Sequence, residues 1–569
     1  MPKTYPRVSF GLYGLEIKQD SNPTTSTPLQ PFSKVQDLRT DAASIMPLAT
    51  YEPDFWLLDG NFSLLPANIE NVHVGLMSLA MSDANGDFPV APVITVTFSK
   101  PQSSDGLVIR FQQHSGDWAK SVTVAYYNAA DSLIQSTIYA PTSPELSTGA
   151  AVSDFQKIVI TFTGTNKPYR YLRVTGIDYG ELLYFERDDI LEARVVEEVN
   201  PLSLELPASE LGLTVHSADA QFSILNPAGK YMALYQRQPI TMYEVVNNRQ
   251  ITIGQYYLNI WRNTSETEVE FEAVDLLGVL DSVPYRGGLW LGGGVSVGDL
   301  LEEIFTAAGV AYELDSSLSA TVVRGWIPYS SARSALQQIG FAVGAMIFCT
   351  RSGAVRILPA RIAGQAETFD GTITRAEKGE SQSLELKTLV TGVDVTAHNY
   401  ITKDETIELF NGSLEAGEHE IAFQQPMRSL SITGATITAS GANFAIINVA
   451  SAGTVILSGL TYADATRVYS TRNTTLPASI KPNIVSIEDA TLVNNANVGE
   501  VAARVFAYYG QRYLQNLRLY APGVEVGDVV LVETLYNRRI QAMVERMEID
   551  LARGMTANVK LTGAEYALD

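Results

Sequence analysis

The 569-residue chain has a single cysteine, Cys349, so it can form neither an internal disulfide nor a thiolate metal cluster. The residues before it, 345–348, are apolar, which favours a buried and unreactive thiol. Long hydrophobic runs are missing too, since "GFAVGAMIFC" (340–349) is about half as long as a membrane span. The N-terminal "MPKTYPRVSF" lacks the apolar core of a secretory signal. We therefore expect a protein made in a reducing cytosol without a membrane anchor.

Positive charge is scarce as well. The chain has 40 Lys and Arg against 62 Asp and Glu, a formal net charge of -22. Such a surface repels nucleic acid phosphates and anionic membranes, which argues against a protein that grips DNA. Apolar residues make up 46% of the chain, so it can bury several cores, and its length predicts several domains.

Motifs for catalysis are also absent from the sequence. The five histidines are isolated: His73, His114, His216, His398 and His419. None belongs to a catalytic triad motif, and no zinc-binding HExxH is present. The stretch "GGLWLGGGVSVGD" (287–299) lacks the Gly-Lys-Ser/Thr ending of a phosphate loop, so we interpret it as a flexible linker. The sequence predicts no enzyme activity and no cofactor.

What the chain has in abundance is two-residue alternation of apolar and polar side chains. Residues 50–185 hold strand after strand, among them 93–99, 121–128 and 157–164, separated by turn residues as in an antiparallel sandwich. In "WLLDGNFSLLP" (56–66), Asp59-Gly60 predicts a hairpin whose apolar residues, Trp56 first among them, belong to a core. A second β-rich block runs from 186 to 281 and contains Asn247-Asn248 as a tight turn.

Helical patterns are few. Ser296 as N-cap and the apolar stripe that follows predict a helix over 296–309, and a shorter one is predicted over 331–340. Together they indicate a compact α+β module near 285–370. A third helix is predicted over 498–515, with Asn497 as its N-cap.

Two candidate sites stand out, each beside an ordinary structural alternative. Asp83, Asn85 and Asp87 alternate like the start of a calcium loop, although Phe88 stands where an EF-hand requires Gly, and a polar turn is the alternative. Trp118 and Tyr126 on the predicted sandwich are candidate sugar contacts, with ordinary sheet aromatics as the alternative.

Several segments resemble tail hub (baseplate hub) proteins of bacteriophages and prophages. They include "YEPDFWLLDGNFSLLP" (51–66), the stretch 190–246 that begins "ILEARVVEEVN", "VGDLLEEIFTAAGVAYEL" (297–314) and "SARSALQQIGFAVGAMIFCTRSGAVRIL" (331–358). The resemblance covers about residues 50–360, and no catalytic or binding residue is carried over with it.

The resemblance implies a structural protein of the virion tail, assembled in the bacterial cytoplasm. It implies a homotrimeric ring that caps the tail tube, with two tube-like β domains from each subunit giving pseudo-six-fold symmetry. Expected partners are other copies of the chain, the tail tube or distal tail protein, the tape measure protein, and tail fibre or receptor-binding proteins. DNA would pass through the ring without specific binding, and an acidic lumen would repel its phosphates.

The predicted fold is mainly β and multidomain, with tube-like β-barrel hub domains, an inserted galactose-binding-like jelly roll and a small α+β insert. The expected domains are an N-terminal strand and N-terminal arm that form part of the first hub domain (1–49), the inserted sandwich (50–185), the first hub β-barrel domain (186–283), and the α+β insert (284–372). The last is a second hub β-barrel domain (373–569), with a β-rich insertion over about 401–483 and the helix at 498–515. Two alternatives stay open: a receptor-binding protein whose sandwich binds host cell-wall carbohydrate, and a hexameric distal tail protein.

Overall fold

The computed structural model describes residues 4–40, 50–53, 55, 75–112, 115–217, 219–227, 229–246, 249–365, 368–477, 479–520, 523–534, 538–552 and 555–566. The chain divides into two compact units. Unit 1 comprises Met1–Val8 and Phe185–Asp569, and unit 2 comprises Ser9–Tyr184. The predicted hairpin at 56–66, with Trp56, and the predicted turn at Asn247-Asn248 lie outside the described residues. The finer domain boundaries given above stay predictions.

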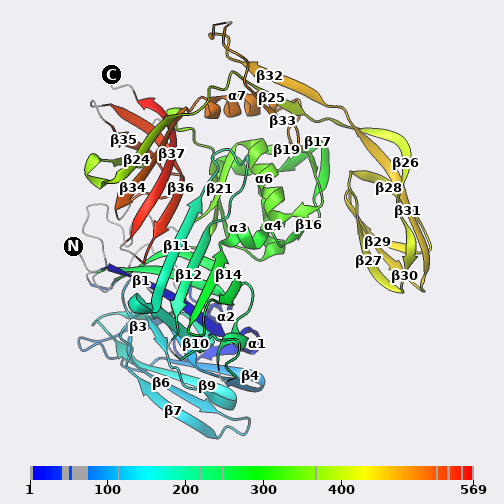
Figure 1. The fold of residues 1–569 in the computed structure, drawn as a ribbon. Helices are drawn as coiled ribbons and strands as arrows, with labels where there is room; N and C mark the ends of the chain where they lie inside the picture. Colours follow the sequence, from blue (N-terminus) through cyan, green and yellow to red (C-terminus); the bar gives the residue numbers. More distant parts are fainter. Residues whose placement is uncertain are drawn as a thin grey trace. The chain divides into compact units, whose positions relative to one another are not determined.

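Unit 2 contains a five-stranded antiparallel sheet, which Figure 1 draws in cyan and blue. Its strand order is β2 (Asn22–Thr25), β4 (Val93–Ser104), β9 (Val152–Thr165), β6 (Ala119–Tyr127) and β7 (Leu133–Tyr139). A second layer is built from β3 (Leu76–Met81), β5 (Leu107–Phe111), β8 (Glu145–Ser147) and the unit 2 part of β10 (Tyr171–Glu186). Strand β1 (Thr4–Tyr13) and the short helices α1 (Leu15–Asp20) and α2 (Asp37–Thr40) precede these layers.

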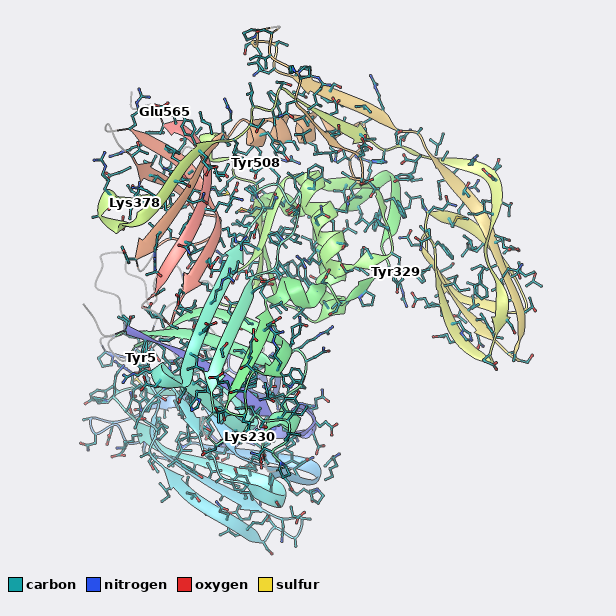
Figure 2. All side chains as sticks on the ribbon, viewed as in Figure 1. Tyr5, Lys230, Tyr329, Lys378, Tyr508 and Glu565 are labelled. Carbon is teal, nitrogen blue, oxygen red and sulfur yellow. The ribbon has the colours of Figure 1, made fainter. Side chains whose placement is uncertain are left out.

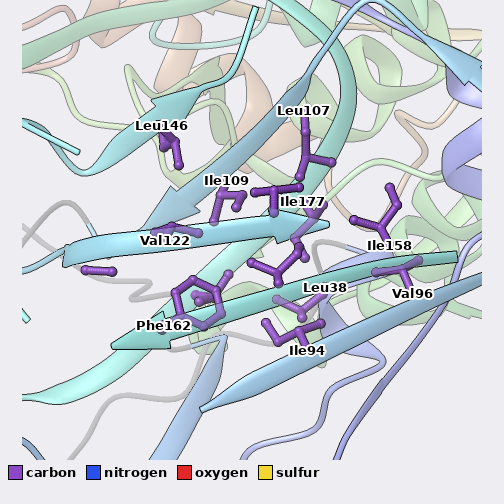
Figure 3. Close-up of a cluster of buried hydrophobic side chains, with 14 of the residues drawn as sticks. Leu38, Ile94, Val96, Leu107, Ile109, Val122, Leu146, Ile158, Phe162 and Ile177 are labelled. Atoms are coloured by element: carbon purple, nitrogen blue, oxygen red, sulfur yellow. The ribbon is translucent and has the colours of Figure 1, made fainter. Parts of the chain in front are cut away.

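One continuous hydrophobic core lies between the two layers of unit 2. Alternate residues of β4 point inward, and Ile94, Val96 and Phe98 are at most 5% exposed. Figure 3 shows Ile94 and Val96 in one cluster with Ile109 and Ile177 of the second layer. Burial of each such side chain contributes about 1.5–3 kcal/mol. The predicted sandwich is therefore confirmed, because alternation on both sheets fills one core.

The main sheet of unit 1 draws its strands from two distant parts of the sequence. The order is β24 (Lys378–Leu386), β34 (Tyr513–Tyr520), β37 (Thr556–Tyr566), β36 (Arg539–Asp550), β11 (Ile190–Glu198), β12 (Glu210–His216), β15 (Glu268–Val274), β14 (Arg249–Asn263) and β13 (Pro239–Val246). Beyond β36, β35 (Val529–Glu533) pairs with it and with β23 (Gly371–Ile373). Because β11 pairs with β36, the block at 186–281 and the C-terminal block share one sheet.

The α+β module follows β15 and has its own core. Its elements are α3 (Leu276–Leu280), β16 (Pro284–Tyr285), β17 (Gly288–Ser296), α4 (Val297–Ala308), β18 (Tyr312–Leu314), α5 (Ser316–Ser319), β19 (Val322–Ile327), β20 (Ser330–Ser331), α6 (Ala332–Val343), β21 (Ala345–Cys349) and β22 (Val355–Pro359). As predicted, Ser296 caps α4, accepting the Asp299 N–H at 3.1 Å. The buried sides of α4 and α6 meet in one cluster.

One prediction for this module is wrong. The glycine-rich stretch at 287–299 is not a flexible linker, because most of it forms β17, paired antiparallel with β19. The strand carries a bulge between Trp290 and Val295, where Gly292 and Gly294 have positive φ. The glycines therefore shape a bulge, a backbone conformation that other residues rarely adopt.

A third module of unit 1 combines a helix with a small sheet. It contains β25 (Gly392–Ala397), β32 (Arg467–Arg472), β33 (Ile484–Ile487) and α7 (Val498–Tyr509). The predicted helix over 498–515 ends at Tyr509, because the residues from Tyr513 onward pair with β24 and β37. Asn497 makes no side-chain capping bond to α7, contrary to the prediction. Tyr508, labelled in Figure 2, donates to Glu545 Oε1 at 3.1 Å and so fixes α7 to the C-terminal block.

The predicted β-rich insertion forms a small β-sandwich, which we call the arm. Its two sheets contain β26 (Tyr400–Leu414), β31 (Gly453–Asp464) and β28 (Met427–Thr433), and β27 (Gly417–Ala422), β30 (Phe444–Val449) and β29 (Thr436–Ser440). Figure 1 shows β26 and β31 running side by side. A modest core, with Phe423, Ile447 and Leu457 at its centre, joins the two sheets. The mainly β, multidomain fold predicted from alternation is thus confirmed.

Candidate functional site: surfaces of the two units

The candidate calcium residues form a closed turn. Asp83 Oδ1 accepts the backbone N–H groups of Asn85 at 2.8 Å and Asp87 at 2.9 Å. These hydrogen bonds to the ionised form lower the pKa of Asp83. Lys120 Nζ forms an ion pair with Asp87 at 2.5 Å and donates to the Asn85 carbonyl oxygen at 3.1 Å. Across the described residues, no three or more His, Cys, Asp or Glu side chains gather as metal ligands.

The candidate sugar contacts lie in or against the core of unit 2. Tyr126 is 3% exposed and packs edge-to-face on Phe155, with ring centroids 5.2 Å apart. Burial raises the pKa of Tyr126. Trp118 is half-buried, and its Nε1–H donates to the Pro141 carbonyl oxygen at 3.0 Å. Tyr126 is therefore part of the sandwich core, and Trp118 packs against that core from its border.

Sequence reasoning missed a buried ionic cluster in unit 2. Arg173, 3% exposed, donates to Glu52, whose carboxylate is fully buried, with Nη1 and Oε1 2.8 Å apart. Beside this pair, Asp117 lies 2.9 Å from Lys167 Nζ and 3.4 Å from Arg170 Nε. Glu52 also accepts the Tyr171 N–H at 3.0 Å. The cluster fixes β10 to the segment at 50–53, and its acidic members are too far in the sequence from its basic members for any spacing rule to connect them.

The histidines that the structure describes have separate places. His398 Nδ1 lies 2.7 Å from Asp464 Oδ2, and its Nε2 lies 2.8 Å from the Glu488 carbonyl oxygen. Since His398 precedes β26 and Asp464 ends β31, this contact joins the two roots of the arm. His216 is exposed on β12, and His419 Nε2 is 2.8 Å from the Glu415 carbonyl oxygen. His73 and His114 lie outside the described residues.

One face of the unit 1 sheet concentrates negative charge. The residues of β11, β12 and β15 that alternate with the buried ones all point to this side, which we call the acidic sheet face. Among the described residues of these three strands, it holds one arginine, Arg194, one histidine, His216, and no lysine, against six carboxylates: Glu192, Glu198, Glu210, Glu268, Glu270 and Glu272. On β15, Glu268, Glu270 and Glu272 follow one another at alternate positions, and Glu210 on β12 and Glu192 on β11 lie on the same side, so their fields add.

The strands on either side of β11, β12 and β15 determine how far the negative charge extends across the sheet. On β14, Arg262 binds both Glu270, at 2.7 Å, and Glu272, at 2.9 Å. On β36, Glu548 and Asp550 extend the negative charge, and Glu548 pairs with Arg194 at 2.8 Å. Arg546, on the same strand, lies opposite Glu198 and is 3.7 Å from its carboxylate. Farther along the sheet, β37 and β34 carry Lys560 and Arg518 on the same side, so the sign of the charge changes there.

The outermost strand of this sheet, β24, presents an open edge. Leu384 is 52% exposed and Leu386 is 61% exposed, and Tyr520 on the adjacent β34 is 55% exposed. Figure 2 labels Lys378 at the start of this strand. Within the described ranges, β34 is the only strand that pairs with β24. An open edge with exposed apolar side chains is suited to pairing with another chain.

Comparisons with known proteins find similarity to this chain in structure and none in sequence. No protein-family model and no curated protein sequence matches the chain. The fold is similar to the 43 kDa tail protein of prophage MuSo2 from Shewanella oneidensis, at 8% identity and a TM-score of 0.39, covering 67% of this chain and 95% of that one. It is also similar to the tail protein from Neisseria meningitidis MC58, at 12% identity and a TM-score of 0.40, covering 67% and 93%.

A family 32 carbohydrate-binding module from C. perfringens, solved in complex with galactose, matches 31% of this chain and 99% of the module. The identity is 8% and the TM-score is 0.19. At such values these matches transfer no ligand, partner or activity to this chain. Within the described residues, no helix is long and apolar enough to cross a membrane.

Proposed function

We propose that this chain is a structural protein of a phage tail or tail-like particle, that three copies form a hub ring at the end of the tail tube, and that DNA passes through the ring. The proposal rests on the resemblance in the sequence and, above all, on the pairing of β11 with β36. This pairing joins two β blocks of one chain edge to edge in a continuous sheet. Three copies would then supply six similar β blocks, which fits a six-fold tube.

The acidic sheet face is the surface that we assign to the lumen. A lumen for DNA must not bind the phosphate backbone, and closely spaced carboxylates repel it. The arginines on and beside this face support the assignment, because Arg194, Arg262 and Arg546 are each paired with carboxylates of the sheet. They hold the strands together and present little free positive charge to a passing strand of DNA.

The open edge of β24 is the surface that we assign to the contact between subunits. Hydrogen bonds from an adjacent chain would complete its backbone, and Leu384 and Leu386 would be buried at the same time. Closing a ring in this way uses each edge once, so growth stops when the ring is complete.

We also propose that the chain acts through surfaces and catalyses no reaction. Two ionisable groups of unit 1 illustrate this. Asp275 accepts the N–H groups of Ser209 at 2.8 Å and Gly278 at 3.1 Å, and thereby caps α3. Burial raises the pKa of the nearby Cys349 thiol, which makes it a poor nucleophile.

Mass photometry of the purified chain followed by cryo-electron microscopy tests the proposal. The expected particle has three times the 61.9 kDa chain mass, with the carboxylates of the acidic sheet face around a central channel. A six-fold ring would instead support the distal tail alternative. A monomer at physiological salt, or a channel lined by Lys and Arg, would overturn the hub proposal. A glycan array on the same preparation tests the receptor-binding alternative.

A further inference from the structure

Strand β7, at one edge of the five-stranded sheet in unit 2, has features that the hub proposal does not use. Figure 1 draws it at the border of its sheet, beside β6. The structure, over the residues it describes, pairs no strand with the other side of β7. Leu133 is 57% exposed, Ile134 is 41% exposed and Ile138 is 72% exposed. A strand edge with exposed β-branched side chains is a template for another strand.

The other edge of the same sheet lacks these features. Strand β2 has only four residues, Asn22–Thr25, and includes Pro23, which has no N–H to offer to a further strand. Strand β7 has seven residues and contains no proline. Its one irregularity is a bulge at the start of the strand, near Leu133, and Gln135–Tyr139 pairs regularly with β6. One edge is therefore protected against pairing, and the other is open to it.

The charge around β7 indicates what kind of partner fits. The chain has a net charge of -22, yet no residue from Ser132 to Pro144 is charged. Two copies of so acidic a molecule repel each other, and they approach at the lowest cost where charge is absent. A basic partner would find no carboxylate on this strand to recognise.

The sequence of β7 is also complementary to itself. When two copies run antiparallel about Ser136, Ile134 lies opposite Ile138, Leu133 lies opposite Tyr139, and Gln135 lies opposite Thr137. Apolar residues meet apolar ones and polar residues meet polar ones. Outward-facing residues also remain on one side, because residues directly opposite each other in an antiparallel pair share a face.

We propose that β7 is a two-fold contact between two copies of this chain, in which the strands pair antiparallel about Ser136 and join two sandwiches into one continuous sheet. The contact is separate from the hub ring and does not depend on it. A single strand pair is a small interface, so the association depends on concentration. Chains held close together in a particle reach the required local concentration more easily than free chains do.

Disulfide trapping in the full chain tests this contact. Ser136 is exposed, and across the two-fold axis the paired residues would lie about 4.5–5.5 Å apart between Cα atoms, within reach of a disulfide. Under a mild copper–phenanthroline oxidant, we expect Ser136→Cys to yield mostly a covalent dimer on a non-reducing gel. The wild type, with only Cys349, and Thr24→Cys, on the protected edge strand β2, are the matched controls. Dimers that are absent, or equally abundant with Thr24→Cys, would overturn the proposal.

Two further variants test the register and the energetics. An Ile134→Cys protein mixed with an Ile138→Cys protein should cross-link, whereas either one alone should not. Ile138→Lys should abolish the non-covalent dimer in sedimentation velocity while leaving the circular dichroism unchanged, because the side chain is 72% exposed. Retained dimers in this variant would contradict the proposal. The two proposals can fail separately. If the β7 contact exists but the hub ring does not form, cross-linking of Ser136→Cys stops at dimers. If the ring also forms, cross-linking joins rings in pairs.

Discussion

Asn443 is the residue that holds the arm against the α+β module. Its side chain is fully buried, accepts from Trp326 Nε1 at 2.6 Å, and donates to the carbonyl oxygens of Arg286 at 2.9 Å and Ile327 at 2.7 Å. Asn443→Ala would leave a donor and two acceptors without partners, at a cost of about 1–3 kcal/mol. We expect faster hydrogen exchange in β30 and β19, measured by mass spectrometry. Asn411→Ala, at an exposed site on the same arm, is the control and should change neither strand.

Asp178 makes the stability of unit 2 depend on pH. Its carboxylate is buried and accepts hydrogen bonds from Lys18 Nζ at 2.7 Å and from Arg110. Burial alone would raise the pKa of Asp178, but Arg110 and Lys18 outweigh it and hold the pKa below its ordinary value. Because the folded-state pKa is depressed, the stabilisation is complete above the unfolded-state pKa of about 3.9 and is lost as the pH falls through the folded value.

We therefore expect Asp178→Asn to lower the free energy of unfolding by about 3 kcal/mol near neutral pH. Between about pH 5 and pH 2, the difference from the wild type should shrink, because the wild-type carboxylate becomes protonated as well. Urea unfolding at a series of pH values measures this. Asp131→Asn, which removes the carboxylate from an exposed ion pair with Lys157, should have little effect at any pH. A difference that grows on acidification would contradict the assignment.

These residue contacts also show what the sequence cannot reveal. Glu52 and Arg173 are separated by 121 positions, and Asn443 and Trp326 by 117. In a chain with 62 acidic residues, no single carboxylate stands out as the one that becomes buried. Such partners are brought together only by the pairing of strands and the packing of modules. By contrast, the apolar partners inside the sandwich are evident from alternation alone.

At the scale of elements, β17 offers a sharp comparison between two adjacent glycines. Gly294 has φ +73°, and an added Cβ would lie 2.5 Å from the Val323 carbonyl oxygen, whereas a Cβ on Gly293 would meet nothing within 4 Å. We expect Gly294→Ala to cost about 1–3 kcal/mol through strain and loss of the bulge. Gly293→Ala should change stability by less than about 0.5 kcal/mol. Chemical denaturation of both variants measures the contrast, and equal effects would mean that the bulge is not required.

Helices and strands that are specified by capping residues and apolar periodicity can be predicted from the sequence. Those that depend on pairing with a distant strand cannot. The Ser296 cap and the apolar stripe after it define α4 within a few residues, because capping and helical packing are local properties. Past Tyr509, the residues at 513–520 have apolar positions that fit a helix as well as a strand. They become β34 because β24 and β37 satisfy its backbone from both sides. The bulged strand β17 is likewise held by its pairing with β19, and no local sequence pattern predicts this pairing.

At the scale of the whole molecule, the balance of charge governs assembly. A chain with a net charge of -22 repels its own copies, and the repulsion extends about 30 Å at 0.01 M salt but only about 8 Å at 0.15 M. The contact proposed at β7 contains no charged residue, and the contact proposed at β24 buries Leu384 and Leu386, so neither proposal relies on ion pairs that low salt would strengthen. We therefore expect the fraction of chains in oligomers to rise as sodium chloride increases from 0.01 M to 0.15 M, as measured by mass photometry at fixed protein concentration. Sucrose, matched for osmolality, is the control and should leave the fraction unchanged at low salt. An oligomer that dissociates as salt is added would show that ion pairs between subunits hold it together, and the contacts would then have to be sought on charged surfaces.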